Sequence, residues 1–506
     1  MPRYAAIDIG SNSVRMLAAD VTAAGKMEPL VSDREVTRLG EAVFANGTIA
    51  VQAADFVCAV LRRMAAAYTK LDPLAVRAVA TAAVRDASNQ REFIDRASEA
   101  LGTPVEIISG REEARLIHLG VESCWPHPDR RLMIVDVGGG SAEIILAENG
   151  HLSDAYSKPL GAVRLTGMFL DDDPPHPEQI ARMHNYIQER LAAVVQKMGA
   201  KPCDRAVATS STAAAMVCAV NRVPRSRREQ ADRFRATLPQ VRRLYKELSG
   251  RNSAGRAKIP GIGLRRAQII VPGVAVLLEC MQRFHLPSLY YSVAGVREGL
   301  VADLAARRVG SERLQLARDA RREVERLAAR YQVPLKRARK VAHFARTLFE
   351  SLRPLHGLPP DWAKLLEAAA YLFDAGHFVS DTGHHKHSEY IVLNSDLPGF
   401  TDHEKTLVGN LCRFHRKAMP SARHTDFQQL APEDRRALYL LIPLLRLADA
   451  LDRGHEQRVE DIACEVDAAG VTIRTISSSK ADLEIWAAER VADAFTAAYQ
   501  RALAVT

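Results

Sequence analysis

Two stretches decide the fold of this chain: Asp8-Ile-Gly-Ser-Asn-Ser13 and Asp136-Val-Gly-Gly-Gly-Ser141, which share the pattern D-[IV]-G-x-x-S. Each stretch lies between two apolar segments that have the character of β-strands, residues 4–8 and 14–21 around the first, and 131–136 and 141–148 around the second. Glycines in such a turn leave backbone N–H groups exposed, and the missing Cβ atoms let a phosphate come close to them. The repeat predicts two duplicated α/β halves, each with a phosphate-binding turn.

Outward from these turns, strand and helix signals alternate up to about residue 307, which is typical of an α/β layer fold. Beyond that point the chain is helical and rich in Arg and Ala until about residue 459, where two short strand segments and a helix follow. We predict four domains: an α/β domain at 1–124, its duplicate at 125–307, a helical domain at 308–458 and a small α+β domain at 459–506.

Composition narrows the class of protein. The 506 residues are 47% hydrophobic and 25% charged, which is ordinary for globular domains, and the formal net charge of +9 favours anionic partners. The seven cysteines form no C-x-x-C pair, so zinc ribbons are excluded and reduced thiols are expected. The N-terminus carries no apolar leader, and no stretch is long and apolar enough to cross a bilayer. We expect a cytoplasmic protein without a transmembrane segment.

The residues of the two turns suggest a phosphate and metal site. Hydroxyl and amide groups of Ser11–Ser13 and Ser141 can donate to phosphate oxygens, and a strand rather than a helix follows each turn, which excludes a P-loop and a Rossmann turn. Asp8 and Asp136 should face one cleft, where they could hold a divalent metal ion. Glu143 shares a strand face with Ser141, so it is either a second metal carboxylate or an exposed strand charge.

Three further residues are candidates on position alone. Arg85 follows a strand end, where it would hold phosphate oxygens or simply be solvated. Ser210 precedes a helix, where it would be either an anion ligand or an N-cap. Glu122 ends the helix that the pattern Ser109-x-x-Glu112 begins, and a carboxylate there opposes the helix dipole, which hints at function or at a frayed end.

Seven motifs in order, over about 300 residues, resemble the exopolyphosphatase/guanosine pentaphosphate phosphatase family, within the actin-like, sugar-kinase and heat-shock ATPase superfamily. The motifs are AAIDIGSNSVRM (5–16), VATAAVRDASN (79–89), ISGREEARLIHLGVES (108–123), IVDVGGGSAEI (134–144), LGAVRLT (160–166), ATSSTA (208–213) and GVREGL (295–300). The resemblance implies an actin-like (ribonuclease H-like) lobe with a two-domain cleft, magnesium dependence with potassium as a candidate second ion, and a homodimer.

The resemblance also implies roles. Glu122 matches the catalytic carboxylate that orients or deprotonates water, and Asp136 and Glu143, beside Asp8, match the metal side. The phosphate-binding positions are Gly10, Ser11, Asn12, Ser13, Arg15, Arg85, Gly138, Gly139, Gly140, Ser141 and Ser210.

The helical region resembles the HD-type domain of longer family members. His343 matches the first metal ligand and Asp449 the last, but the expected His-Asp pair reads Phe373-Asp374. A phenyl ring cannot coordinate a metal, so we expect no active second metal centre there.

The helical region also carries clusters of basic residues and histidines. The run GHHKHS, with His384, His385 and His387, is either a metal cluster or a polyanion contact. A groove for a long polyanion would draw on Lys336, Arg337, Arg339, Lys340, His384, His387, Arg413, Arg416 and Lys417, each of which is otherwise part of a solvated helix face.

We therefore expect an exopolyphosphatase, which hydrolyses terminal phosphates of inorganic polyphosphate processively by metal-assisted in-line attack of water. The alternatives are a guanosine pentaphosphate 5'-phosphohydrolase, a phosphotransferase from polyphosphate to a nucleoside diphosphate, and a non-catalytic phosphate or alarmone sensor. Without a recognisable nucleic-acid-binding motif, a nucleic-acid partner is not expected.

Overall fold

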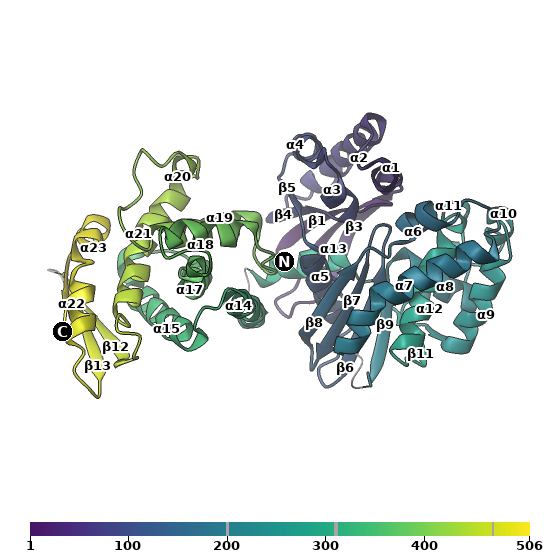
Figure 1. Cartoon of the computed structure of the whole chain (residues 1–506). Helices are drawn as coiled ribbons and strands as arrows, with labels where there is room; N and C mark the ends of the chain where they lie inside the picture. The colour runs from purple at the N-terminus through teal and green to yellow at the C-terminus, as the bar shows by residue number, and fades with distance from the viewer. Residues whose placement is uncertain (199–201, 308–311, 468–469) are drawn as a thin grey trace. The chain divides into compact units, whose positions relative to one another are not determined.

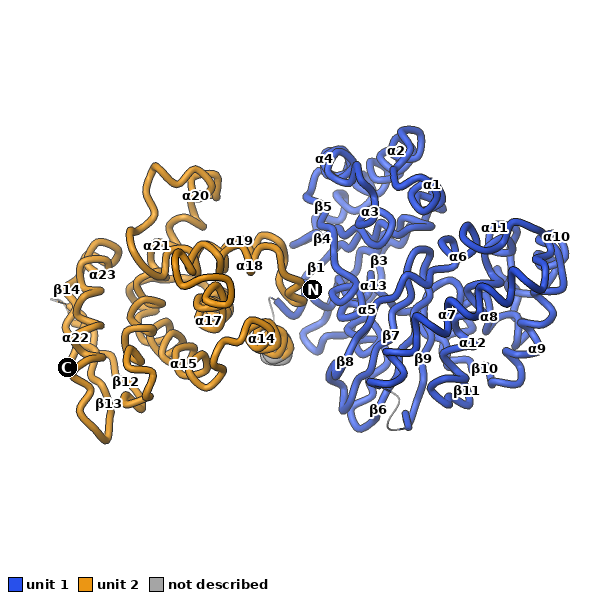
Figure 2. The backbone as a smooth tube through the Cα atoms, viewed as in Figure 1, with its two compact units in different colours: residues 1–313 blue, residues 314–506 orange. Residues whose placement is uncertain are grey.

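The computed structural model describes residues 1–198, 202–307, 312–467 and 470–506 (Figure 1). The chain divides into two compact units, Met1–Arg313 and Leu314–Thr506 (Figure 2). Among the described residues, no helix is long and apolar enough to cross a membrane.

Unit 1 contains a five-stranded sheet with the order β3-β2-β1-β4-β5. Strand β1 pairs antiparallel with β2 and parallel with β4, so the first glycine turn joins the two central antiparallel strands. The strands are β1 (Arg3–Ile9), β2 (Val14–Val21), β3 (Met27–Glu35), β4 (Ala75–Ala80) and β5 (Val105–Ile107).

A second sheet, with the order β10-β11-β9-β6-β7-β8, repeats this arrangement. Strand β6 pairs antiparallel with β7 and parallel with β9, and Asp136 lies opposite Glu143 in the β6–β7 register. The two halves therefore share one topology, as the repeated turn predicts. The strands are β6 (Arg131–Val137), β7 (Ala142–Glu148), β8 (His151–Lys158), β9 (Arg205–Thr209), β10 (Arg235–Thr237) and β11 (Ser288–Tyr291).

Helices cover both sheets of unit 1. They are α1 (Leu39–Asn46), α2 (Val51–Thr69), α3 (Ala82–Asp86), α4 (Gln90–Leu101), α5 (Gly110–Cys124), α6 (Ala162–Phe169), α7 (Pro177–Met198), α8 (Ser210–Val220), η1 (Arg225–Ala231), α9 (Leu238–Ser249), α10 (Ser253–Arg256), α11 (Leu264–Ala267), α12 (Ile270–Arg283) and α13 (Val296–Ala306).

Helix α5 contacts both sheets. On one side Leu116 packs with Leu300 of α13 against residues of β1, β2 and β4, and on the other side Ile117 and Val121 pack against β6 and β7. Neighbouring apolar positions such as Leu116 and Ile117 point to different sides of a helix, so one short helix can bury two faces. Helix α13, which we expected to belong to 125–307, packs on the first sheet instead.

Two glycines allow α5 and α13 to approach closely. A Cβ atom on Gly299 would lie 1.8 Å from the carbonyl oxygen of Leu116, and one on Gly120 would lie 2.2 Å from the carbonyl oxygen of Gly295. No larger residue fits at either position without backbone movement. The middle and the C-terminal half of α5 are thereby held against α13.

A buried ionic network holds the same helix pair. Arg115 donates to Glu112 at 2.7 and 2.8 Å and to Asp303 of α13 at 2.8 Å, while Arg77 of β4 donates to Asp303 at 2.8 Å. Ser109 caps α5 by accepting from the N–H of Glu112 at 3.1 Å. The carboxylate of Glu112 thus pairs with arginines, as a buried charge requires.

Unit 2 is helical up to β12 and has one continuous apolar core. Its helices are α14 (Glu312–Arg330), α15 (Leu335–Ser351), α16 (Arg353–His356), α17 (Asp361–Leu372), η2 (Ala375–Phe378), α18 (His384–Asn394), α19 (Asp402–Phe414), α20 (Thr425–Gln428), α21 (Pro432–Ala450), α22 (Asp482–Glu489) and α23 (Ala492–Tyr499). The predicted strand pair is seen as β12 (Val459–Val466) and β13 (Gly470–Ser477), joined by an unforeseen β14 (Ala502–Val505).

Candidate active site

The two glycine turns have the same backbone geometry. The N–H of Gly10 donates to the carbonyl of Ser13 at 3.1 Å, and the N–H of Gly138 donates to that of Ser141 at 3.0 Å. The turns also contact each other, since a Cβ atom on Gly139 would lie 3.1 Å from the Cβ of Ser11. The two halves of unit 1 therefore meet at their glycine turns.

A cleft runs between these turns and gathers most of the residues predicted from the sequence. Those lining it are Asp8, Gly10, Ser11, Asn12, Ser13, Arg15, Asp136, Gly138, Gly139, Gly140, Ser141 and Ser210. It is also lined by four charged residues that sequence reasoning missed: Glu113, Arg266, Arg297 and Glu298.

Ser210 adopts an unusual backbone conformation at the start of α8. Its φ of 75° lies in the left-handed region that non-glycine residues rarely adopt. The hydroxyl of Ser210 donates to the carbonyl of Val137 at 2.9 Å, and Ser210 also hydrogen-bonds Asp136. Such strain is typical of functional sites and here holds the N-terminus of α8 at the cleft.

Glu113 brings a further carboxylate to the acidic side of the cleft. It lies in the first turn of α5 and is buried. Burial and the neighbouring Glu143, Asp8 and Asp136 raise the pKa of Glu113 well above its usual range, while Arg85 opposes the shift. A carboxylate with a raised pKa can accept a proton near neutral pH, as a general base must.

Of the other three carboxylates, Asp136 and Glu143 are buried and Asp8 is half-buried. Burial raises the pKa of Asp136 to about 6, and burial with the nearby Asp136 raises that of Glu143 to about 7. Burial raises the pKa of Asp8 as well. Glu143 is only 1% exposed and accepts from the hydroxyl of Ser157 at 2.7 Å, so it is not an exposed strand charge.

The carboxylate oxygens of these three residues do not all lie within 4.8 Å of one another. Asp8 and Asp136 line the cleft, whereas Glu143 lies opposite Asp136 in the β6–β7 register and outside the described lining. A cation bound between them would relieve the repulsion that raises the pKa values of Asp136 and Glu143. Mg²⁺ prefers such oxygen ligands and is usually bound by one or two carboxylates together with substrate phosphates. Asp8, Asp136 and Glu143 are the residues that could hold it.

Glu122, which we expected to be catalytic, does not line the cleft. It lies near the far end of α5, where it accepts from the backbone N–H of His127 at 2.9 Å and lies 3.3 Å from the His127 ring. Although burial opposes it, these hydrogen bonds lower the pKa of Glu122, which makes its carboxylate a weaker base. The helix carries the two glutamates more than two turns apart, so only one can face the cleft.

Glu113 could have been found from the same helix pattern. We interpreted Glu112 as part of the capping pattern that begins α5 and gave Glu113 no role. One of the pair, Glu112, is indeed structural, since it pairs with Arg115. Because Glu112 already serves the start of α5, the second carboxylate beside it, Glu113, was the signal that we overlooked.

Arg85 is also placed differently from our prediction. Its guanidinium donates to the carbonyl of Ile108 at 2.6 Å and lies 3.6 Å from the carboxylate of Glu113, outside the lining of the cleft. Arg85 therefore lies beside Glu113, and its predicted contact with phosphate stays a prediction.

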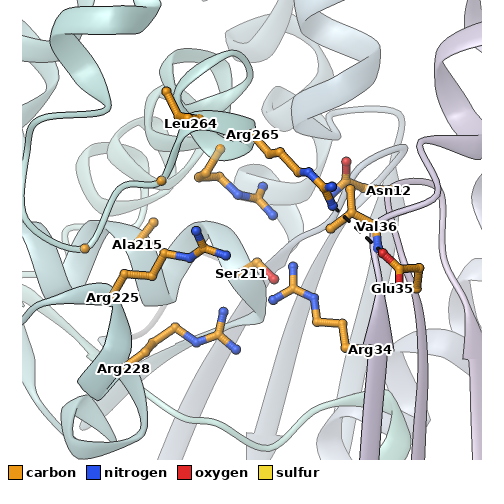
Figure 3. Close-up of a pocket in the computed structure, with 13 residues that line it drawn as sticks. Asn12, Arg34, Glu35, Val36, Ser211, Ala215, Arg225, Arg228, Leu264 and Arg265 are labelled. Atoms are coloured by element: carbon orange, nitrogen blue, oxygen red, sulfur yellow. Dashed lines mark hydrogen bonds and ion pairs between the residues drawn. The ribbon is translucent and has the colours of Figure 1, made fainter.

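A second pocket, of about 540 Å³, shares Asn12, Ser211 and Arg266 with the cleft. Figure 3 shows guanidinium groups from β3, η1 and α11 directed into it. Its charged lining residues are Arg34, Glu35, Arg225, Arg228, Arg265 and Arg266. We call this cavity, which is lined by five arginines, the arginine pocket.

Most charges of the arginine pocket lack a counterion. Within the described residues, Arg34, Arg225, Arg228 and Arg266 form no ion pair, and Arg265 lies 3.9 Å from Glu35. Burial and the surrounding arginines lower the pKa of Arg34 to about 8 and that of Arg266 to about 10. Crowded cations of this kind favour a polyanionic ligand.

The predicted groove residues of unit 2 are mostly engaged with partners inside that unit. Arg337 is buried and pairs with Asp374 and with Asp449, so it does not line an open groove. Arg339 pairs with Glu325, and Arg413 pairs with Glu389. Lys340 donates to a backbone carbonyl, and Arg416 contacts His384. Lys336 and Lys417 are exposed, and His387 is half-buried. The groove stays a prediction.

The HD-type metal site is not assembled as the motif predicts. His343 lies 2.9 Å from Asp461 at the edge of β12. Arg337 pairs with both Asp374 and Asp449 and lies 5.4 Å from the ring centre of Phe373. A guanidinium therefore takes the place of a cation between the two aspartates.

The two matched sheets, with glycine turns facing one cleft, define an actin-like fold. The sequence matches the Ppx/GppA phosphatase family over residues 19–308 and domain III of Ppx/GppA phosphatases over residues 320–486. The chain belongs to the Ppx/GppA phosphatase family.

Solved structures agree with this assignment. The Ppx/GppA family member from Aquifex aeolicus is 28% identical with a TM-score of 0.54, and the match covers 61% of this chain and 99% of that one. An exopolyphosphatase from Cytophaga hutchinsonii is 25% identical with a TM-score of 0.56, over 61% and 99%. An exopolyphosphatase-like protein is 26% identical with a TM-score of 0.57, over 60% and 97%.

Proposed function

We propose that this phosphatase is an exopolyphosphatase, which removes terminal phosphates from inorganic polyphosphate. The observation that carries the proposal is the arginine pocket, which shares lining residues with the cleft. A polyphosphate bears about one negative charge on every internal phosphate, so the chain behind the reacting end needs several cations. The pocket supplies five guanidinium groups next to the glycine turns.

The chemistry follows from the cleft residues. Backbone N–H groups of the glycine turns, together with Ser11, Ser13 and Arg15, hold the terminal phosphate. Glu113 takes a proton from water while the water oxygen attacks phosphorus. The bridging P–O bond breaks, and the shortened polyphosphate leaves with the electron pair on its new terminal oxygen.

Asp8, Asp136 and Glu143 would hold Mg²⁺, which when bound supplies positive charge to the phosphate oxygens. Arg85, 3.6 Å from the carboxylate of Glu113, helps to keep that carboxylate oriented. No serine or cysteine nucleophile is needed for this reaction.

The lining of the arginine pocket favours polyphosphate over a nucleotide. Its described lining residues include no aromatic ring on which a base could stack. Guanosine pentaphosphate is the alternative substrate, since its phosphates could use the same cleft. The exopolyphosphatase from Cytophaga hutchinsonii, over 99% of its length, is one relative that supports the proposal.

The direct test compares the two substrates. Phosphate release would be measured with the purified chain and Mg²⁺ on long-chain polyphosphate and on guanosine pentaphosphate, at equal concentrations of terminal phosphate. We expect kcat/KM to be at least tenfold higher on polyphosphate. A higher kcat/KM on the nucleotide would contradict the proposal and assign the cleft to guanosine pentaphosphate. Binding of both without release would indicate a sensor.

A further inference from the structure

A group of donor atoms that the phosphatase cleft does not use lies in unit 2. Asp374 follows α17, His377 lies in η2, His384 begins α18 and His415 follows α19. One carboxylate oxygen of Asp374 and one ring nitrogen each of His377 and His384 lie within 4.8 Å of one another. Four segment ends of the helical unit therefore meet around a small set of potential metal ligands.

The distances between these atoms suit a common metal ion. The Oδ1 atom of Asp374 lies 3.6 Å from Nε2 of His377 and 4.0 Å from Nε2 of His384. Nε2 of His384 lies 3.3 Å from Nε2 of His415. Around a tetrahedral ion with bonds of about 2.1 Å, neighbouring ligand atoms are about 3.4 Å apart. The atoms of Asp374, His377 and His384 lie within 4.8 Å of one another, and His415 would complete the set after a side-chain shift.

The histidines present their Nε2 atoms to this point because their Nδ1 atoms face oxygen acceptors. Nδ1 of His377 lies 2.6 Å from the carboxylate of Asp381, and Nδ1 of His384 lies 3.3 Å from the backbone carbonyl of Asp381. Nδ1 of His415 donates to the carbonyl of Cys412 at 2.7 Å. We assign the ring proton to Nδ1 in His377 and His415, which leaves a lone pair on each Nε2. Nδ1 of His384 also lies 3.2 Å from Nη1 of Arg416, so His384 takes this tautomer when Arg416 moves away. Metal-binding histidines are oriented by outer oxygens in this way.

Burial keeps part of this cluster in the neutral form. His384 and His415 are buried, whereas the side chain of His377 is 43% exposed. Burial lowers the pKa of His384, and it lowers that of His415 to about 3. The exposed side of the cluster gives an ion a path from solvent, while the buried side offers uncharged nitrogens.

The surrounding backbone holds the cluster in place. A Cβ atom on Gly376 would lie 2.0 Å from the carbonyl oxygen of His384, so only glycine permits the contact between η2 and α18. The hydroxyl of Ser388 accepts from the N–H of Gly376 at 2.8 Å and donates to the carbonyl of Phe373 at 2.6 Å. The two segments that carry His377 and His384 are therefore fixed against each other.

One cation competes for the site. Nη1 of Arg416 lies 3.2 Å from Nδ1 and 3.5 Å from Nε2 of His384. Arg416 is exposed, so its guanidinium can move into solvent when an ion binds. The other oxygen of Asp374 pairs with Arg337, which leaves Oδ1 facing the histidines.

We propose that Asp374, His377 and His384, with His415 as fourth ligand, bind one divalent transition-metal ion of the zinc class. Imidazole nitrogens favour zinc, nickel and cobalt over magnesium, which prefers oxygen ligands. The ion would link the ends of α17, α18 and α19. The site shares Asp374 with the aspartate pair of the HD-type motif but uses its Oδ1 atom, whereas Arg337 pairs with its Oδ2 atom.

The proposal is tested by titrating the full chain, without an affinity tag and after chelator treatment, with Co²⁺. Excess Mg²⁺ would occupy oxygen-lined sites, and visible absorption would report Co²⁺ bound to nitrogen ligands. Competition with Zn²⁺ would then give the affinity of the site for Zn²⁺. We expect one ion per chain, with a Kd in the micromolar range or below.

Two variants localise the ion. His377→Ala removes a partly exposed ligand and should weaken binding at least tenfold, and Asp381→Asn should weaken it less by loosening His377. His387→Ala is the matched control from the same histidine run and should bind as the wild type does, with circular dichroism confirming that each variant is folded. The proposal is overturned if the wild type shows no nitrogen-bound Co²⁺, or if His377→Ala binds it unchanged.

Discussion

Arg225 and Arg228 lie together in η1, and both direct a guanidinium into the arginine pocket (Figure 3). Neither forms an ion pair with a described residue, so their charges are available to a ligand. A hydrogen bond to a charged group contributes about 1.5–3 kcal/mol, which corresponds to roughly tenfold to a hundredfold in affinity.

The double variant Arg225→Gln/Arg228→Gln should therefore raise KM for long-chain polyphosphate at least tenfold. Its kcat should change little, because neither arginine lines the cleft where phosphorus reacts. Arg62→Gln, which removes an exposed arginine of α2, is the matched control and should leave both constants unchanged. Steady-state phosphate release measures this, and an unchanged KM in the double variant would show that substrate does not reach the arginine pocket.

Glu143 gives a prediction for stability without metal. Its pKa is raised to about 7 in the folded chain, against about 4.3 in an unfolded one. A raised carboxyl pKa stabilises the fold at low pH, and this contribution is lost as the pH rises from about 4 through 7. In chelator, the melting temperature of unit 1 should fall over this range.

The variant Glu143→Gln should flatten this fall, because glutamine does not ionise. Calorimetry from pH 5 to 8 compares the two proteins, with Glu148→Gln on the exposed end of the same strand as the control. Equal slopes for wild type and Glu143→Gln would remove Glu143 from the buried acidic cluster.

Single residues were predicted unevenly from the sequence. The turn residues from Asp8 to Arg15 were found because a glycine turn between two strands carries its own geometry. Glu113 was missed because α5 carries both Glu113 and Glu122. Only the packing of α5 against the two sheets decides which of them faces the cleft. The arginine pocket was missed since its members come from segments far apart in the chain.

At the scale of elements, the contact between α5 and α13 positions Glu113. Gly299→Ala would place a methyl group against the backbone of Leu116, which cannot move without displacing α5. Overpacking of this kind costs about 1–3 kcal/mol, so we expect a lower melting temperature and lower activity together.

Gly167→Ala is the matched control for that substitution. Gly167 also lies within a helix, α6, and a Cβ atom there would meet nothing within 4 Å. Alanine favours a helix by up to about 1 kcal/mol over glycine, so this variant should melt at the same temperature or slightly higher. If both variants melt alike, the α5–α13 contact does not hold the helix as described.

The sequence predicted elements best where the pattern was local. The strand pairs around both glycine turns match the structure closely. Helix α13 was assigned to the wrong half because a helix pattern does not say which sheet it covers. Strand β14 was missed since four residues at the chain end give too short a signal.

At the scale of the whole molecule, unit 1 contains both the cleft and the arginine pocket. A chain of residues 1–313 should therefore keep phosphate release from short polyphosphates. If unit 2 binds the distal part of long chains, the full chain should have a lower KM for these, and the difference should shrink as salt rises. Equal KM values for long chains would remove unit 2 from substrate binding.

We propose that polyphosphate is hydrolysed in the cleft with Glu113 as the base. Initial rates of phosphate release would be measured for wild type, Glu113→Gln and Glu122→Gln on long-chain polyphosphate with saturating Mg²⁺. We predict that Glu113→Gln lowers kcat at least ~10²-fold, the low end for a positioned acid or base, while Glu122→Gln stays within about threefold of wild type. A wild-type rate for Glu113→Gln, or a collapse only in Glu122→Gln, would contradict the account.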